Sequence, residues 1–216
     1  MPGSPSFAAV LLAAGHAERF GGGKLGALLA PGMTVLRRGV LGLLCAEGGL
    51  GGDVWLVGRP GEVGPWLGDL ADEPRVHLVE APNGGGQGDS LAAGARALPE
   101  KSALLVVLGD QPLAAPGAVA AVLGRMRGTP GVTAATAASG GRRMPPVAFG
   151  AGHRPALERL TGDEGARSVL SAASPAVVEL GAGAWALDLD RPEDLPQLRA
   201  AARLDPIVAR ALEGPS

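Results

Sequence analysis

Glycines and two cations follow the first apolar run of the chain. Residues 12–24 read LAAGHAERFGGGK, at the end of an apolar run, 7–13, that predicts a buried strand. Backbone N–H groups of such a loop can surround an anion, and Arg19 and Lys24 add positive charge. The loop is not a P-loop, because Leu25 stands where that motif has Ser or Thr. It is either an anion-binding loop or a flexible loop with two solvated cations.

Carboxylates recur at two later points. Asp110 follows the most apolar run, 103–108, in the sequence GDQP. There it would face the ligand crevice of a parallel sheet, where one carboxylate holds Mg²⁺ if phosphates supply other oxygens. Asp188 and Asp190 are two residues apart at an expected strand, 185–189, so both point to one face. Two carboxylates on one apolar strand destabilise the fold unless they are solvated or bind a cation. Both sites also have a purely structural explanation. Asp110 can cap a turn, and the acidic residues near 190 can lie at the N-terminus of a helix.

A second glycine-rich loop precedes an expected helix. Residues 83–94 read NGGGQGDSLAAG, in which the glycines permit close approach of the backbone to a ligand. The helix is expected at 89–98, with Asp89 as its cap and Ser90 in its first turn. Later in the chain, three arginines are either ligand-binding groups or solvated surface residues: Arg142, Arg143 and Arg167.

The elements that position these residues alternate between strands and helices. This pattern predicts an α/β, Rossmann-like fold of three layers with a mostly parallel central sheet. Its ligand site lies at the carboxyl ends of the strands, where the loops 14–24, 81–90 and 109–112 emerge. We expect one domain, 1–205, and a C-terminal tail, 206–216. The further strands are expected at 53–58, 75–81, 132–138, 146–149 and 176–180, and the further helices at 34–47, 62–70, 116–127, 154–160, 164–172 and 192–203.

The composition excludes several classes of protein. The chain has 216 residues and a net charge of −2, without the basic excess of a nucleic-acid-binding protein. One cysteine, Cys45, excludes an internal disulfide and a cysteine zinc site, and on an apolar helix it is expected to be buried. There is no apolar run of about 18 residues, and no basic segment precedes the first apolar run. We therefore expect a cytoplasmic protein without a membrane span.

The motifs resemble those of a known family. Residues 12–24 are similar to the signature loop of the nucleotidyltransferases that attach nucleotides to molybdopterin, L-A-[AG]-G-x-x-x-R-x-G-x-x-K, and further motifs follow in order to about residue 200. The resemblance implies a Mg²⁺-dependent transferase in which Asp110 holds the metal. Either Asp188 or Asp190 would supply a second carboxylate, and Asp188 is preferred. The implied catalytic residues are Lys24, Arg19 and Asp110, with the two cations stabilising the pyrophosphate leaving group.

The residues at several motif positions resemble those of the cytidylyltransferase branch of that family. These are Ala14 in place of a second glycine, Gln111 after the aspartate, and GDEGAR at 162–167. The branch implies transfer of CMP from CTP to molybdopterin, which gives the cytosine dinucleotide cofactor and pyrophosphate. Arg142, Arg143 and Arg167 would meet the anionic molybdopterin. The implied nucleotide-binding residues are Leu12, Ala13, Ala14, Gly15, Lys24, Gly86 and Ser90.

The chain also departs from the family pattern and leaves alternatives open. Met144 and Pro145 replace the usual Gly-His before Pro146, and Asp89 stands where the family often has Ser or Ala. The alternatives are a guanylyltransferase, a nucleotidyltransferase of another phosphorylated metabolite, and a non-catalytic cofactor carrier. A phosphate nucleophile is ionised at pH 7 and needs no general base, which fits the lack of a Ser/His/Asp set. A molybdoenzyme or its maturation chaperone would be the partner that takes the product.

Overall fold

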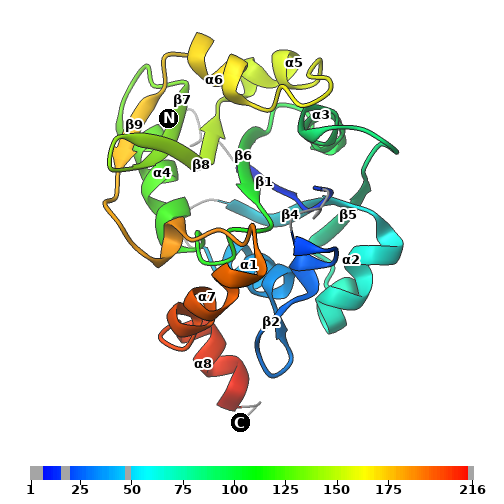
Figure 1. Cartoon of the computed structure of the whole chain (residues 1–216). Helices are drawn as coiled ribbons and strands as arrows, with labels where there is room; N and C mark the ends of the chain where they lie inside the picture. Colours follow the sequence, from blue (N-terminus) through cyan, green and yellow to red (C-terminus); the bar gives the residue numbers. More distant parts are fainter. Residues whose placement is uncertain (1–6, 16–19, 47–49, 214–216) are drawn as a thin grey trace.

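The computed structural model describes residues 7–15, 20–46 and 50–213. Within them, seven strands form one sheet in the order β5-β4-β1-β6-β8-β7-β9 (Figure 1). Every pairing is parallel except those of β8, which runs antiparallel to β6 and β7. The predicted mostly parallel sheet is therefore confirmed. The strands are β1 (Phe7–Leu12), β4 (Leu50–Gly58), β5 (Val76–Glu80), β6 (Ala103–Leu108), β7 (Ala134–Ser139), β8 (Arg142–Phe149) and β9 (Ala176–Glu179).

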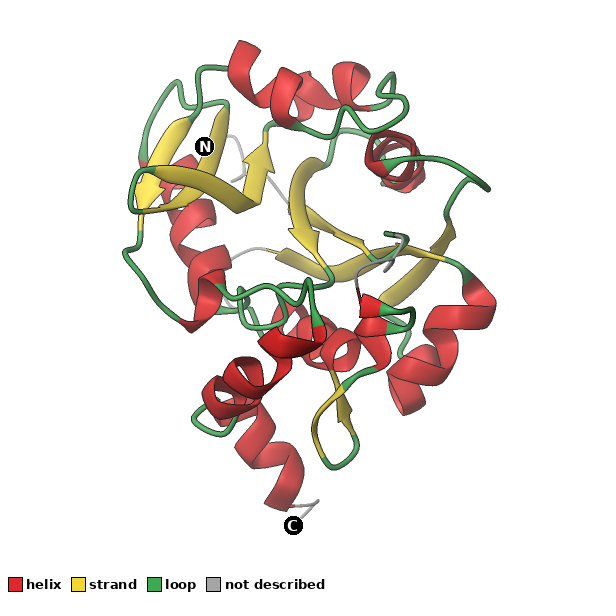
Figure 2. Cartoon of the chain, in the orientation of Figure 1, coloured by secondary structure: helices red, strands yellow, loops and turns green. Residues whose placement is uncertain are grey.

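Helices cover both faces of this sheet, as Figure 2 shows. One face packs against α3 (Gln87–Ala97), α5 (Arg154–Leu157) and α6 (Arg167–Ala172). The other packs against α1 (Val35–Leu44), α4 (Gly117–Gly128), α7 (Leu195–Ala202) and α8 (Pro206–Glu213), while α2 (Pro60–Leu67) lies beside α1. The three-layer α/β fold expected from the alternation of elements is the observed one.

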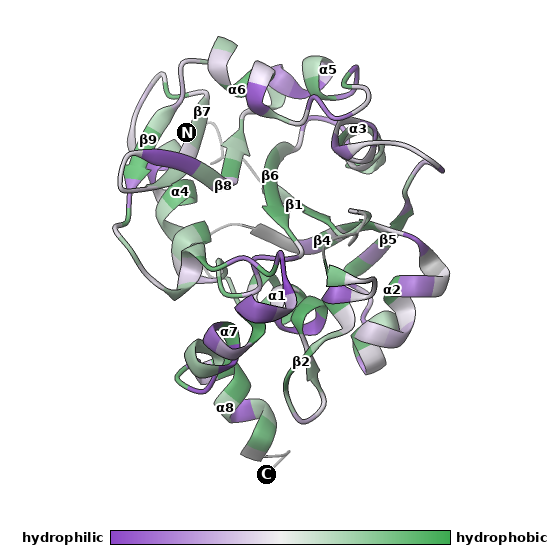
Figure 3. Ribbon diagram, viewed as in Figure 1, coloured by the Kyte–Doolittle hydropathy of each residue, from purple (hydrophilic) through white to green (hydrophobic). Residues whose placement is uncertain are grey.

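The central strand β1 belongs to both halves of the core. Alternate side chains of a strand point to opposite faces of its sheet. Phe7, Ala9 and Leu11 accordingly pack on the α1 side, whereas Val10 and Leu12 pack on the α3 side. β1 and β6 are hydrophobic over their lengths in Figure 3. A strand buried on both faces reads as a continuous apolar run, which explains why these two strands were predictable.

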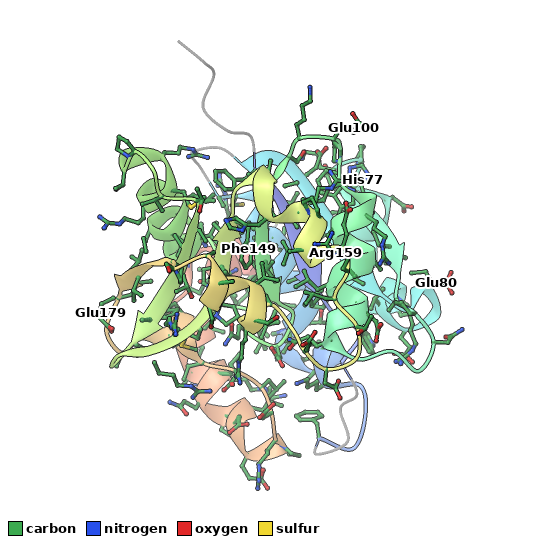
Figure 4. The ribbon with its side chains drawn as sticks, turned by 90° about the horizontal axis from the view of Figure 1, so that it is seen from above. His77, Glu80, Glu100, Phe149, Arg159 and Glu179 are labelled. Atoms are coloured by element: carbon green, nitrogen blue, oxygen red, sulfur yellow. The ribbon has the colours of Figure 1, made fainter. Side chains whose placement is uncertain are left out.

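Buried and exposed side chains separate clearly in a view from above. Phe149 on β8 is fully buried and lies over the middle of the molecule, whereas the charged Glu80, Glu100 and Glu179 lie at its periphery (Figure 4). None of the helices in the described part of the chain combines the length and hydropathy that a membrane span needs.

The expected strand at 185–189 is wrong. The structure has a 3-10 helix at Ala184–Ala186, and the next four residues pair with no strand of the described sheets. The reason is a competing contact, because the backbone N–H of Leu189 donates to the carbonyl oxygen of Asp110 at 3.0 Å. The segment is thereby fastened to the turn after β6 instead of extending the sheet.

Smaller differences concern the ends of elements. Helix α3 begins at Gln87 with Gly86 as its N-cap, so Asp89 lies in its first turn and is not the cap residue. Cys45 is exposed, because it caps the carboxyl end of α1. The short hairpin of β2 (Leu28–Ala30) and β3 (Met33–Thr34) had no signal in the sequence pattern. The C-terminal segment contains α8, on which Val208 is buried.

Candidate functional site

A cavity of about 610 Å³ opens at the carboxyl ends of β1 and β6. Its walls come from the loop after β1, the turn after β6 and the glycine-rich loop before α3. The structure therefore brings together the residues that the resemblance assigned to nucleotide binding. They are Leu12, Ala13, Ala14, Gly15, Lys24, Gly86 and Ser90, and Asp110, the predicted metal ligand, lines the same cavity. Arg19, the other predicted cation, lies outside the described residues.

Lys24 and Asp110 form an ion pair in this cavity. The Lys24 Nζ lies 2.7 Å from Asp110 Oδ2, and only 12% and 20% of the two side chains is exposed. Lys24 begins a short 3-10 helix, Lys24–Gly26, whose N-cap Gly23 has a φ of 60° that favours glycine. The turn carrying Asp110 is held because Gly109 N–H donates to the carbonyl oxygen of Leu12 at 2.9 Å. A Cβ at position 109 would lie 3.0 Å from that oxygen.

Two more carboxylates lie beside this pair, although not on a strand. Asp190 Oδ1 is 3.7 Å from Lys24 Nζ. Burial raises the pKa of Asp188, and the negative charges of Asp110 and Asp190 raise it further. Asp194 orients the segment, because its Oδ2 accepts hydrogen bonds from the backbone N–H groups of Asp190 and Arg191, at 3.0 and 2.7 Å. This role of Asp194 was not predicted from the sequence.

The carboxylates fit a divalent cation that is also bound by a ligand. Asp110 Oδ1 is buried and has no hydrogen-bond partner. Burial, and then the negative charges of Asp110 and Asp190, raise the pKa of Asp188, and a bound cation would offset both effects. Within residues 7–15, 20–46 and 50–213, no three His, Cys, Asp or Glu side chains are grouped as a complete metal site. An ion here would therefore take one or two carboxylates and draw other oxygens from phosphates and water, as Mg²⁺ commonly does.

The opposite wall of the cavity is a pair of loops fastened by Asp89. Its Oδ2 accepts hydrogen bonds from the N–H groups of Gly86, at 2.9 Å, and Gly162, at 2.8 Å. The N–H of Gly88 donates to the carbonyl oxygen of Gly162 at 2.7 Å. The residue at which the chain departs from the family pattern thus holds the wall in place. Asp163 lines the same cavity and was also missed by sequence reasoning.

A second cavity, of about 460 Å³, adjoins the first. Leu12, Gln87 and Leu108 line both cavities. The second one contains the three arginines singled out in the sequence, Arg142, Arg143 and Arg167, together with Asp188. The arginine side chains are exposed, and in the described part of the chain none of them forms an ion pair. This cavity suits an anionic ligand.

The two cavities have the chemistry of group transfer between anions. Neither is lined by His or Cys, so the described walls offer neither of these side chains as general base or nucleophile. They offer one lysine, several carboxylates, many glycine backbone groups and three arginines. Such a site acts by alignment of reactants and by neutralisation of charge, the two requirements of phosphoryl-type transfer.

Comparisons with solved structures show the same fold. A homolog of the Mycobacterium tuberculosis protein rv0371c, from Mycobacterium sp. strain JC1, superposes with a TM-score of 0.69 at 23% identity, over 92% of this chain and 98% of that one. Rv0371C from M. tuberculosis H37Rv, solved as a complex with manganese, gives 0.67 at 20% identity, over 91% and 99%. CMP:2-keto-3-deoxy-manno-octonic acid synthetase complexed with CTP gives 0.72 at 14% identity, over 93% and 99%.

Sequence comparisons identify the family. A search of curated proteins finds no significant match. Residues 9–177 match the model of the MobA-like NTP transferase domain, and this range holds most of β1, Lys24, Asp110 and the three arginines of the second cavity. Because the match spans most of the chain and the fold agrees, the chain belongs to the family of MobA-like NTP transferase domains, and its activity is nucleotidyl transfer.

Proposed function

We propose that the protein transfers CMP from CTP to molybdopterin, giving the cytosine dinucleotide cofactor and pyrophosphate. The observation that carries the proposal is the pair of adjoining cavities, one with Lys24 and Asp110 between glycine-rich loops and one with three arginines. A nucleotide and an anionic acceptor in these cavities would meet at Leu12 and Leu108. The CTP complex of a protein with the same fold supports the choice of nucleotide, as does the resemblance of residues 12–15 and 109–112 to the cytidylyltransferase branch.

In this reaction a phosphate oxygen of the acceptor attacks the α-phosphorus of CTP. A bond forms between them, the bond to the bridging oxygen of the β-phosphate breaks, and pyrophosphate leaves with that electron pair. The nucleophile is already ionised at neutral pH, so the chain needs no base. Lys24 and Arg19 stabilise the charge on the leaving group. A Mg²⁺ ion held by Asp110, with Asp188 or Asp190, would supply further positive charge against the phosphate oxygens.

The other residues bind and orient. The backbone of residues 12–15, with Gly86 and Ser90, encloses the nucleotide. Arg142, Arg143 and Arg167 bind the anionic acceptor in the second cavity. A molybdoenzyme or its maturation chaperone would receive the product.

The test is pyrophosphate release with molybdenum-loaded molybdopterin and Mg²⁺, comparing CTP, GTP, ATP and UTP. We expect release with CTP alone, its loss when Mg²⁺ is chelated, and its loss in Asp110→Ala. Release with GTP would make the protein a guanylyltransferase. Binding of nucleotide or molybdopterin without release would favour another phosphorylated acceptor or a carrier.

A further inference from the structure

The turn after β6 places two neighbouring residues in the walls of different cavities. Asp110 lines the first cavity with Lys24, whereas Gln111 lines the second with the three arginines. The turn is short and fixed, since Gln111 N–H donates to the carbonyl oxygen of Leu108 at 3.2 Å and Ala114 N–H donates to that of Gln111 at 3.2 Å. The nucleotidyl transfer assigned so far uses Asp110 and leaves Gln111 without a role.

The side chain of Gln111 is buried and unpaired. Only 4% of the residue is exposed, its Oε1 has no hydrogen-bond partner, and its amide group makes no side-chain hydrogen bond with the described residues. Buried polar groups are nearly always paired, and one left unpaired costs free energy. An amide in this state on the wall of a ligand cavity is explained if the ligand itself supplies the partner.

The surroundings of Gln111 show what kind of ligand that is. Leu91, Val106 and Val147 line the same cavity and are buried, so its inner wall is apolar. Thr136 is also buried there, but its hydroxyl lies 3.2 Å from the carbonyl oxygens of Ala137 and Met144 and is already paired. Arg142, Arg143 and Arg167, which also line the cavity, are exposed residues. The cavity thus combines an apolar interior, the buried unpaired amide of Gln111, and exposed polar residues that include the three arginines, Gln87 and Asp188.

We infer that Gln111 determines acceptor specificity, by pairing its amide with the N–H edge of a flat heterocycle bound in the second cavity. The amide oxygen accepts from the ring N–H, and the amide N–H₂ can donate to an adjacent ring carbonyl. The apolar side chains pack on the ring faces, and the arginines face the anionic part of the ligand. The identity of the acceptor rests on the proposed function, since a pterin carries such an edge. The pairing of the amide with a ring N–H does not depend on that function.

A matched pair of small probes tests this without any variant. Lumazine has two ring N–H groups, and 1,3-dimethyllumazine has the same ring system with both blocked. We expect the wild-type protein, with CTP and Mg²⁺ present, to bind lumazine about tenfold more tightly or better, measured by the fluorescence of the ring. Equal binding of the two probes, or binding of neither, would overturn the inference.

The variant Gln111→Met then assigns the effect to this residue. It keeps the length of the side chain and its packing among apolar residues but removes the amide. We expect it to lose the preference for lumazine and to raise the KM for molybdopterin about tenfold, while the KM for CTP is unchanged. Gln197→Leu on the exposed surface of α7 is the control and should change neither.

The outcomes separate the inference from the proposed function. If the KM for CTP rises and the probe preference persists, Gln111 contacts the nucleotide and the inference is wrong. If wild-type protein releases no pyrophosphate with CTP and molybdopterin but prefers lumazine through Gln111, the proposed acceptor is wrong and the inference stands. If molybdopterin is a substrate and Gln111→Met matches the wild type with both probes, the inference alone fails.

Discussion

Lys24 is the charged residue whose removal should affect the reaction most directly. It contacts Asp110 at 2.7 Å, lines the first cavity and is only 12% exposed in its side chain. We expect Lys24→Ala to lower the turnover of CTP by about 10²–10³, by analogy with the loss of one electrostatic donor to a developing negative charge. The measurement is steady-state pyrophosphate release. Near wild-type turnover would show that Lys24 does not stabilise the leaving group.

Asp188 illustrates a conflict between stability and function at a single residue. Its pKa is raised above that of the unfolded chain by burial and by the charges of Asp110 and Asp190. The ionised form is therefore disfavoured in the folded state, and this lowers the free energy of unfolding at neutral pH. The loss disappears at a pH below the pKa values of both the folded and the unfolded chain, where Asp188 is protonated in both states. We expect Asp188→Asn to raise the Tm at pH 7 without divalent cations and to lower turnover.

Asp190→Asn is the comparison, because Asp190 Oδ1 lies 3.7 Å from the cationic Lys24 Nζ, which offsets the cost of the negative charge. It should change the Tm less than Asp188→Asn does, as measured by calorimetry. A fall in Tm for Asp188→Asn would contradict the assigned charge environment, and unchanged turnover would remove Asp188 as the preferred second carboxylate.

At the scale of elements, the start of α3 and the loop at 161–163 form one wall through backbone contacts. A Cβ at Gly88 would lie 2.8 Å from the carbonyl oxygen of Thr161 and 2.9 Å from that of Gly162. Gly88→Ala must therefore push the loop at 161–163 away from the cavity. We expect it to weaken CTP binding about tenfold or more, measured by calorimetry, because misplaced binding groups lose alignment.

The matched control is Gly124→Ala in helix α4. A Cβ there meets nothing within 4 Å, and alanine is the better helix former. CTP affinity should be unchanged, and stability should rise by up to about 1 kcal/mol. If Gly88→Ala behaves like Gly124→Ala, the wall does not depend on this close approach.

At the scale of the whole molecule, the C-terminal segment is bonded to the functional turn by one buried arginine. Arg38 on α1, 1% exposed in its side chain, pairs with both carboxylate oxygens of Asp205, at 2.9 and 2.6 Å. Its guanidinium also donates to the carbonyl oxygens of Pro112 and Ala115, at 3.2 and 3.0 Å. One side chain thus links the chain after Asp110 to the start of α8.

Asp205→Asn would leave this guanidinium buried without its counterion. We expect the free energy of unfolding to fall by about 3–5 kcal/mol and the Tm to fall by roughly 6–20 °C in thermal unfolding. Glu62→Gln, in the more exposed pair with Arg59 at 3.4 Å, is the control and should shift the Tm little. Equal effects of the two substitutions would mean that the C-terminal segment does not stabilise the fold through Arg38.

The sequence alone determined the fold class, the central strands and the loops that carry the functional residues. Buried strands are continuous apolar runs, and glycine-rich or acidic turns directly after them mark the carboxyl edge of a parallel sheet. For this reason Lys24 and Asp110, 86 positions apart, could be placed at one site. Their catalytic roles, and those of the three arginines, stay predictions.

Only the tertiary structure decided how the other segments pack against the carboxyl edge of the sheet. The strand expected at 185–189 is instead fastened by the Asp110 carbonyl group, Asp89 joins two loops, and residues 206–213 form a helix next to a buried ion pair. The separation of Asp110 and Gln111 into adjoining cavities was equally unpredictable. Most of these contacts use backbone groups, which every residue type has, and those that fasten one segment to another join distant positions. They therefore leave no local pattern in the sequence.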